Sequence, residues 1–485
     1  MPQKIIDEYF YKFFQCPHWL WYDIYGDATK KKKVPKIIDL IYKGKLATEG
    51  ATLKQFKEFE EINPELTKDV EESFLATLEL MKQGKNIYHG TLMDKDWVGM
   101  PDLLEARPLR STQGEPAKSN FGPWEYSVYD IRGSLDLRED VRFQLVFYSL
   151  ILERLQGVRP REAYVMDPDG NTRSFLVDDF VDQFQLTCEQ IEKILDGEKP
   201  APFLKSGCKR TPWYSVCVSD AKDCNDVSLV YRLSQSDQRH LYNVGIKTID
   251  QLAKADINEL QAKIEDWPFD KLVRFSNQAK MLVNNETYII KKPDFPKVQN
   301  EIYFDVESDP TRDIYYLLCF LVKSGDAKPE YKYFWANGKE EESKIWKQFL
   351  DFLASWDDFV IYHFAPYERQ VFDRLKAQYG APEVLERKFV GNTIDLHMKL
   401  VESVVLPLYF YTLKDVAKHI GFNWDAPDAG GAESVTWYND WLDTKGEDIK
   451  LKILRYNEDD VRATLLVKEW LETQRPHTQK ESLGE

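Results

Sequence analysis

The segment from Glu301 to Ser308 constrains the fold of this chain more than any other feature. Its apolar and polar residues alternate with period two, which is the pattern of a β-strand. Asp305 and Glu307 therefore lie on one face of that strand, because side chains two residues apart point the same way. Two carboxylates about 4 Å apart repel each other by about 4 kcal/mol at an effective dielectric of about 20. The pair indicates either a strand face screened by water or a site completed by protons, cations or a basic partner.

Three later segments add acidic residues to this pair. An apolar strand runs to His363 and is followed by a helix that carries Glu368, and another apolar stretch leads to Asp395. Near the C-terminus, Tyr456 and Asp460 are four residues apart in a predicted helix and so share one face of it. These additions favour a cation site over a screened strand face.

The order of these motifs resembles the DEDD (DnaQ-like) 3′→5′ exonucleases of the RNase H-like fold. Asp305-x-Glu307 is similar to the first motif of that family, the stretch from His363 to Glu368 to the second, and Tyr456 to Asp460 to the third. The Tyr-Glu ending of the second motif is similar to the YprB-like branch, as are Thr412–Ala417 and Asp460–Thr464. The resemblance covers residues 298–475 and implies an α/β domain with a mixed sheet.

The same resemblance implies a two-metal hydrolysis of phosphodiester bonds with Mg²⁺ or Mn²⁺. Asp305 is expected to bridge two ions, Glu307 and Asp460 to hold the ion that activates water, and Glu368 to hold the other. Tyr456 is expected to orient the water, with a packed aromatic residue as the alternative. Glu368 stands where the wider family has aspartate, which favours Mn²⁺ or slower chemistry because Mg²⁺ demands near-ideal octahedral geometry.

Two residues near these motifs are assigned other roles. His363 is predicted to be a hydrogen-bonded core histidine rather than a catalytic base. Asp395 is predicted to support the metal site.

Residues 1–205 carry a second set of motifs. Asp102 follows Val-Gly-Met-Pro, Asp130 lies two before Arg132 in an alternating strand, and Gln144 and Tyr148 share a helix face. This order resembles the RecB-like branch of the PD-(D/E)xK nucleases, with Asp102 and Asp130 as metal ligands. Glu49 is the match proposed for the early helical glutamate of that branch.

Arg132 stands where that family has lysine. Arginine stays protonated and is bulkier than the compact ammonium of lysine. Two interpretations stay open: Arg132 neutralises charge in an active site, or the site has lost catalysis and binds DNA.

Six cysteines and no secretion leader favour free thiols or metal ligands over disulfides. The RecB-like branch often carries an iron–sulfur cluster, with one cysteine before the nuclease core and three after it. Cys16, Cys208, Cys217 and Cys224 are the candidates for a [4Fe–4S] cluster or Zn²⁺, although Thr211 stands at one expected cysteine position. Scattered thiols or a relic site are the alternative. The cysteine-bearing segment is assigned to residues 206–227.

Residues 228–285 are predicted to form several short helices, and residues 228–290 are assigned to a helix-hairpin-helix-like DNA-binding region. The stretch from His240 to Ala253 resembles a helix-hairpin-helix element, with Gly245 at the turn. Backbone N–H groups at such a turn, together with Lys247, are expected to bind a DNA phosphate; a plain helical connector is the alternative. Prolines then mark a linker before the domain at 298–475, and residues 476–485 form a polar tail.

The predicted fold class is therefore α/β multidomain: a PD-(D/E)xK-like domain, a helical middle, and an RNase H-like domain. The formal net charge of −16 argues against a basic coat for DNA but permits one local groove. No apolar run reaches the roughly 18–20 residues of a membrane span, so no membrane partner and a cytoplasmic location are expected. The predicted function is an exonuclease on DNA, with RNA as a second substrate. The alternatives are a catalytically weakened binding module or an accessory subunit of a helicase or defence assembly.

Overall fold

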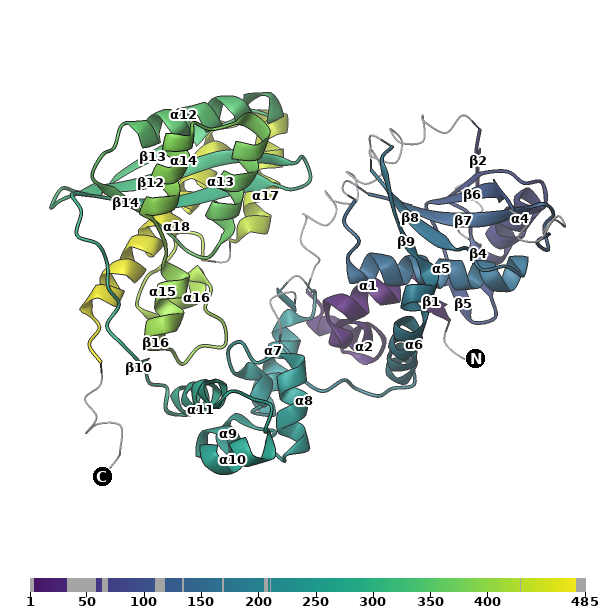
Figure 1. Cartoon of the computed structure of the whole chain (residues 1–485), viewed down its shortest axis with the longest axis horizontal. Helices are drawn as coiled ribbons and strands as arrows, with labels where there is room; N and C mark the ends of the chain where they lie inside the picture. The colour runs from purple at the N-terminus through teal and green to yellow at the C-terminus, as the bar shows by residue number, and fades with distance from the viewer. Residues whose placement is uncertain are drawn as a thin grey trace. The chain divides into compact units, whose positions relative to one another are not determined.

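The computed structural model describes residues 4–32, 58–62, 69–109, 118–132, 135–167, 170–204, 208–209, 211–427 and 429–476. The chain forms two compact units, which divide between Val218 and Ser219. Figure 1 shows both units as mixtures of helices and strands, which confirms the α/β class. The division falls inside the predicted cysteine-bearing segment, and the helices of 228–290 belong to the same unit as the C-terminal domain.

The first unit is built on a six-stranded sheet in the order β2-β3-β6-β7-β8-β9. Helix α5 packs on β7, and α1 and α6 pack on α5. The core is rich in aromatic rings, among them Phe10, Phe147 and Phe184. A small second sheet has the order β1-β5-β4. The bounds of the elements are β1 Ile5–Ile6, α1 Glu8–Gln15, α2 Pro17–Tyr25, β2 Glu60–Glu61, α4 Val70–Lys82, β3 Ile87–Tyr88, β4 Leu92–Asp94, β5 Trp97–Gly99, β6 Leu103–Pro108, β7 Trp124–Ile131, α5 Glu139–Gln156, β8 Glu162–Met166, β9 Thr172–Leu176 and α6 Val181–Leu195.

The second unit begins with a helical region that confirms the prediction of several short helices. Ser234 and Thr248 each cap a helix in a reciprocal capping box, which satisfies N–H groups that would otherwise lack partners. Gly245 turns the chain between the two helices with φ +87°, a conformation that glycine adopts without strain. The bounds are α7 Tyr214–Asp223, within which the division between the two units falls, α8 Gln235–Asn243, α9 Ile249–Lys254, α10 Ile257–Lys263 and α11 Phe269–Asn284.

The C-terminal sheet has five strands in the order β13-β12-β11-β14-β15. Strands β13, β12 and β11 pair antiparallel, whereas β14 and β15 add in parallel, so the predicted mixed sheet is confirmed. Figure 1 shows helices on both faces of this sheet. The bounds are β10 Tyr288–Ile289, β11 Asn300–Asp309, β12 Ile314–Ser324, β13 Glu330–Trp335, α12 Glu342–Ala354, β14 Phe359–His363, α13 Tyr367–Tyr379, α14 Glu383–Asn392, β15 Thr393–Asp395, α15 Leu396–Ser403, β16 Val404–Val405, α16 Leu413–His419, α17 Gly431–Thr444 and α18 Glu447–Thr473.

The alternation along β11 decides what each face of the sheet contacts. Phe304 stacks on Phe349 of α12 and meets Phe389 of α14, so the even-numbered residues build the apolar layer on that side. The odd-numbered residues face the long helix α18: Glu301 pairs with Lys468 there. Asp305 and Glu307 share this face. The strand pairing shifts register between Glu307 and Ser308, an irregularity of the kind that often re-aims side chains next to active sites.

None of the helices in the described part of the chain is both long enough and apolar enough to cross a membrane.

Candidate active site

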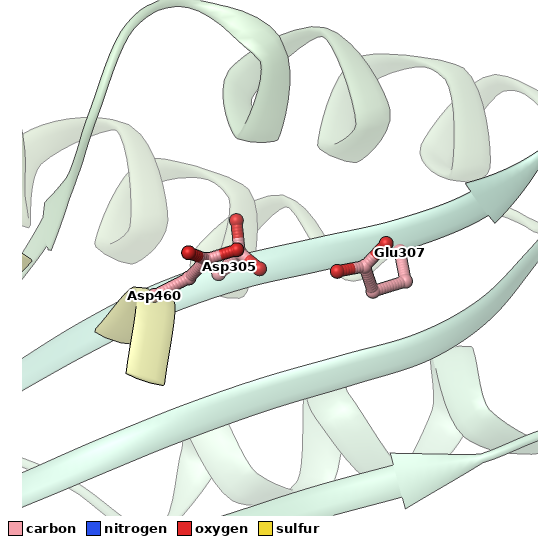
Figure 2. A group of neighbouring side chains, drawn as sticks. All are labelled: Asp305, Glu307 and Asp460. Carbon is pink, nitrogen blue, oxygen red and sulfur yellow. The ribbon is translucent and has the colours of Figure 1, made fainter. Parts of the chain in front are cut away.

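Three carboxylates from two distant segments meet on the α18 side of the sheet. Asp305 and Glu307 come from β11, and Asp460 comes from α18 (Figure 2). One oxygen of each lies within 4.8 Å of one oxygen of both others. Among the residues that the structure describes, this is the one group of three or more Asp, Glu, His or Cys side chains that is so compact. The structure therefore brings together three of the four predicted metal ligands.

The cluster is electrostatically strained when no cation is bound. Burial, and then the charges of Asp460 and Glu307, raise the pKa of Asp305 well above its usual range. Burial and the charge of Asp460 raise the pKa of Glu307 to about 8. Burial also raises the pKa of Asp460 to about 6, although Trp424 and Lys414 lower it. Buried carboxylates that resist ionisation together are a donor set that fits a divalent cation, because its charge removes their repulsion.

Neutral hydrogen-bond donors orient two of these carboxylates. Asn457 donates from Nδ2 to Oδ2 of Asp305 over 2.6 Å, and its own Oδ1 accepts from the Tyr331 hydroxyl over 2.9 Å. The indole Nε1 of Trp424 donates to Oδ1 of Asp460 over 2.7 Å. Both donors are buried, so they fix the carboxylates in place without cancelling the negative charge that attracts a cation.

Tyr456 lies beside the cluster and close to Lys414. Its hydroxyl hydrogen-bonds to Asp460, and burial followed by the charge of Asp460 raises its pKa. The Lys414 ammonium lies 4.9 Å from the centre of the Tyr456 ring and hydrogen-bonds to the carbonyl of Ala429. Its charge lowers the pKa of both Glu307 and Asp460.

Glu368 lies near the three carboxylates but outside their compact group. Its charge is among those that raise the pKa of Asp305. In this structure Oε2 of Glu368 lies 3.3 Å from Nδ1 of His363, which also lies 2.6 Å from the carbonyl oxygen of Ala365. The predicted hydrogen-bonded, buried histidine is therefore confirmed. Asp395 accepts from the N–H of Ala365 over 3.0 Å, so it holds the loop that precedes Glu368.

The Trp424 hydrogen bond has a measurable consequence. Replacing Trp424 by phenylalanine removes the donor to Asp460 and should weaken Mn²⁺ binding by about tenfold, the lower end of what loss of an outer hydrogen-bond partner costs a metal site. Isothermal titration with Mn²⁺ at pH 7.5 measures this effect. Trp356→Phe is the matched control, because the buried Nε1 of Trp356 has no hydrogen-bond partner among the described residues. Equal affinity in the two variants would mean that Trp424 plays no part at the site.

The N-terminal motif residues also gather, in the first unit. Arg132 forms an ion pair with Asp130 and lies 3.5 Å from Oε1 of Gln144. Gln144 donates to the Tyr148 hydroxyl over 2.7 Å. Asp102 accepts from the N–H of Ile131 over 2.7 Å. The arginine thus places a positive charge directly beside Asp130.

Asp7 completes this N-terminal cluster, and sequence reasoning did not find it. Its Oδ2 accepts from the Tyr148 hydroxyl over 2.5 Å and from the N–H of Met100 over 3.3 Å. Burial raises its pKa. In the sequence Asp7 is indistinguishable from an ordinary helix cap, a role that it also fills for α1. Glu49, the residue predicted for the early helical position, lies outside the described residues.

Three of the four candidate cluster cysteines are buried neighbours in the first unit. A hydrogen bond with Cys208 lowers the pKa of Cys16. A hydrogen bond with Cys217, together with burial, outweighs this effect and raises the pKa to about 11. Cys224 is exposed and belongs to the second unit. Zinc and [4Fe–4S] sites use four protein ligands in their closed forms, so a metal or cluster at these cysteines stays a prediction.

The helical turn at Gly245 has the predicted shape, but its backbone donors are occupied. The N–H groups of Gly245, Ile246, Lys247 and Thr248 all donate to protein acceptors, at 2.7–3.1 Å. The expected capture of a phosphate by these amides is therefore not available in this conformation. The exposed Lys247 side chain is the group of this turn that can meet a phosphate.

Several residues of the C-terminal site were not predicted. Asn457 lies inside the third motif and Lys414 inside the Thr412–Ala417 stretch, so both had a signal by position, but nothing in their spacing assigned them a partner. Trp424 had no signal at all. Its indole reaches Asp460 from the loop after α16, a contact that depends on tertiary structure.

Comparison with known proteins supports the C-terminal assignment. Residues 302–472 match the model of the RNase_H superfamily, which supports an RNase H-like domain in this part of the chain. No curated protein matched the sequence. The matched residues span the three carboxylates, Glu368 and Tyr456, and an RNase H-like domain with such a cluster indicates a nuclease-type phosphodiester hydrolase.

Proposed function

We propose that the C-terminal domain is a divalent-metal-dependent exonuclease that hydrolyses single-stranded DNA from its 3′ end. The observation that carries the proposal is the convergence of Asp460 with Asp305 and Glu307, which lie some 150 residues earlier in the sequence, to within 4.8 Å of one another. A strand face that is merely screened by water does not explain why a third carboxylate, from helix α18, lies against Asp305 and Glu307.

Each residue of the candidate active site is assigned a role in hydrolysis. Asp305, Glu307, Asp460 and Glu368 would hold two Mg²⁺ or Mn²⁺ ions. When bound, such ions neutralise the charge of the phosphate and lower the pKa of water. Tyr456, hydrogen-bonded to Asp460, is placed to orient a water by its hydroxyl. Asn457 and Trp424 keep two carboxylates in a ligating orientation, and the Lys414 ammonium offsets part of the cluster's charge.

A second candidate function is nucleic-acid binding with weak or lost hydrolysis. Two observations favour it: Glu368 pairs with His363 instead of joining the compact group, and Arg132 is already engaged with Asp130. Under this second function the PD-(D/E)xK-like domain of the first unit binds nucleic acid without cleaving it, and the protein serves as an accessory subunit of a helicase or defence assembly. An active PD-(D/E)xK nuclease in the first unit belongs instead to the first proposal, and both functions are proposed for the cytoplasm. RNA is the alternative substrate.

Digestion of a 5′-labelled single-stranded oligonucleotide with Mg²⁺ or Mn²⁺ tests the proposal. A 3′→5′ exonuclease should produce a ladder that shortens from the unlabelled end, whereas the same oligonucleotide labelled at its 3′ end should release labelled mononucleotide at once. EDTA should stop both reactions. Binding without cleavage in either metal would support the second candidate function and overturn the first.

A further inference from the structure

A basic pocket lies in the helical region of the second unit, away from the carboxylates. It encloses about 430 Å³ and is lined by side chains from the segment before α8, from α8 itself and from the start of α11. The charged residues among them are Arg232, Asp237, Asp270, Lys271 and Arg274. We call it the arginine pocket.

The charges of this pocket do not cancel. Lys271 is paired with Asp237, which removes one residue of each sign. Arg232 and Arg274 are exposed, and neither forms an ion pair with any residue that the structure describes. Asp270 is the remaining acid. A hydrogen bond joins Arg232 to Tyr231, but neither guanidinium has a carboxylate partner within the described ranges of the chain. Two such guanidinium groups around a cavity form a suitable site for phosphate, because the planar fork of arginine binds phosphate oxygens in pairs.

Arg232 is held firmly despite its exposure. Its backbone has φ +62°, an uncommon conformation for a residue with a side chain. Tyr231 before it stacks on Tyr411 with ring centres 4.0 Å apart, and Leu233 after it is buried. The guanidinium therefore projects from a fixed point on the molecule rather than from a free loop.

A short series of hydrogen bonds leads from the residue next to the pocket to the part of the C-terminal domain that carries Glu368. Tyr231 precedes pocket residue Arg232, and its hydroxyl lies 2.8 Å from Nε2 of His397. The N–H groups of His397 and Ala365 both donate to Asp395, at 2.8 and 3.0 Å. Ala365 lies in the loop that leads into Glu368. Few contacts thus separate the arginine pocket from the second motif of the candidate active site.

We propose that Arg232 and Arg274 bind successive phosphate groups of a single-stranded nucleic acid whose end enters the carboxylate site. Phe269, at the start of α11 next to pocket residue Asp270, is 49% exposed and can stack on a base. A chain with a net charge of −16 needs such a local basic site to bind a polyanion. The direction of the strand rests on the proposed function, whereas the binding itself does not.

Fluorescence anisotropy with a labelled 20-mer of deoxythymidine tests this site, in EDTA so that no hydrolysis occurs. The double variant Arg232→Gln/Arg274→Gln should bind at least tenfold more weakly than the wild type at low salt. The slope of log affinity against log salt should fall by about 1.4, because each phosphate contact in a single strand contributes about 0.7. Phe269→Ala should weaken binding by about tenfold without changing that slope.

Two further variants separate the pocket from general effects. Lys344→Gln/Lys347→Gln removes two exposed charges from α12, which covers the face of the C-terminal sheet opposite to α18. This variant should bind the 20-mer within twofold of the wild type. Arg232→Lys/Arg274→Lys keeps the charges and should keep the salt slope, which distinguishes lost phosphate contacts from misfolding. Equal affinity of the glutamine variant and the Lys344/Lys347 control would overturn the proposal.

The outcomes distinguish this inference from the proposed function. A wild-type chain that binds the 20-mer through the arginine pocket but hydrolyses no phosphodiester would leave this inference standing and remove the nuclease. A chain that hydrolyses DNA while the glutamine variant binds like the control would remove this inference alone.

Discussion

Replacing Asp305 by asparagine should lower the rate of DNA hydrolysis by about a thousandfold or more and, at the same time, raise the thermal stability of the protein. The catalytic loss is expected because Asp305 is part of the compact carboxylate group, and residues that act as a unit lose most of their effect together. The stability gain is expected because burial and neighbouring charges penalise the ionised form of this side chain. Asparagine has nearly the same shape and no charge to desolvate.

Digestion of single-stranded DNA and thermal unfolding in EDTA measure the two effects. A relief of 1 kcal/mol corresponds to a rise in the unfolding temperature of about 2–4 °C in a domain of this size. Asp326→Asn is the control, since Asp326 lies exposed in the turn after β12 and should change neither quantity. An Asp305→Asn protein that still cleaves DNA at the wild-type rate would remove the active-site assignment. A destabilised variant would contradict the electrostatic account.

The metal-free protein should lose stability as the pH rises from about 5 to 8, and Mn²⁺ should restore it. In the unfolded chain Asp and Glu titrate near pH 4. In the folded protein the pKa of Asp460 is raised to about 6 and that of Glu307 to about 8. Between these limits the folded state binds more protons than the unfolded state, so the free energy of unfolding falls with rising pH. The contribution is fully present below about pH 4 and is lost once the pH passes the folded pKa values.

A bound cation reverses this penalty because it favours the ionised carboxylates. Mn²⁺ should therefore raise the unfolding temperature more at pH 8 than at pH 6. Calorimetry in EDTA and in Mn²⁺ at several pH values measures the difference. Glu307→Gln removes the group with the higher of these two pKa values and should flatten the pH dependence without metal, which separates the site from the many other acids of the chain. A metal effect that is the same at both pH values would contradict the linkage.

The predicted site was found in sequence because its residues lie in regular elements. The period-two strand placed Asp305 and Glu307 on one face, and the four-residue spacing placed Tyr456 and Asp460 on one face of a helix. Both placements are properties of local backbone geometry, and both hold in the structure. The Gly245 turn was predicted for the same reason, but the hydrogen bonds that occupy its amides come partly from the side chain of Gln251 and were not foreseen.

Other features depend on contacts between segments far apart in the chain. The pairing of Glu368 with His363 depends on how the loop at Ala365 folds back on itself with φ +74°, and a motif does not specify that geometry. Trp424 reaches Asp460, Asp7 reaches Tyr148, and Tyr231 positions Arg232 beside the C-terminal domain. No periodicity joins these residues, so only packing could reveal their roles.

The sequence by itself determined which residue types carry the chemistry and which face of each strand or helix they occupy, because side-chain direction follows from backbone periodicity alone. The tertiary structure decided which of those faces meet. In the folded chain three acids lie in one compact group, the fourth lies beside His363, and two arginines line one pocket. These contacts arise because burial and ion pairing act between elements that are far apart in the linear order of residues.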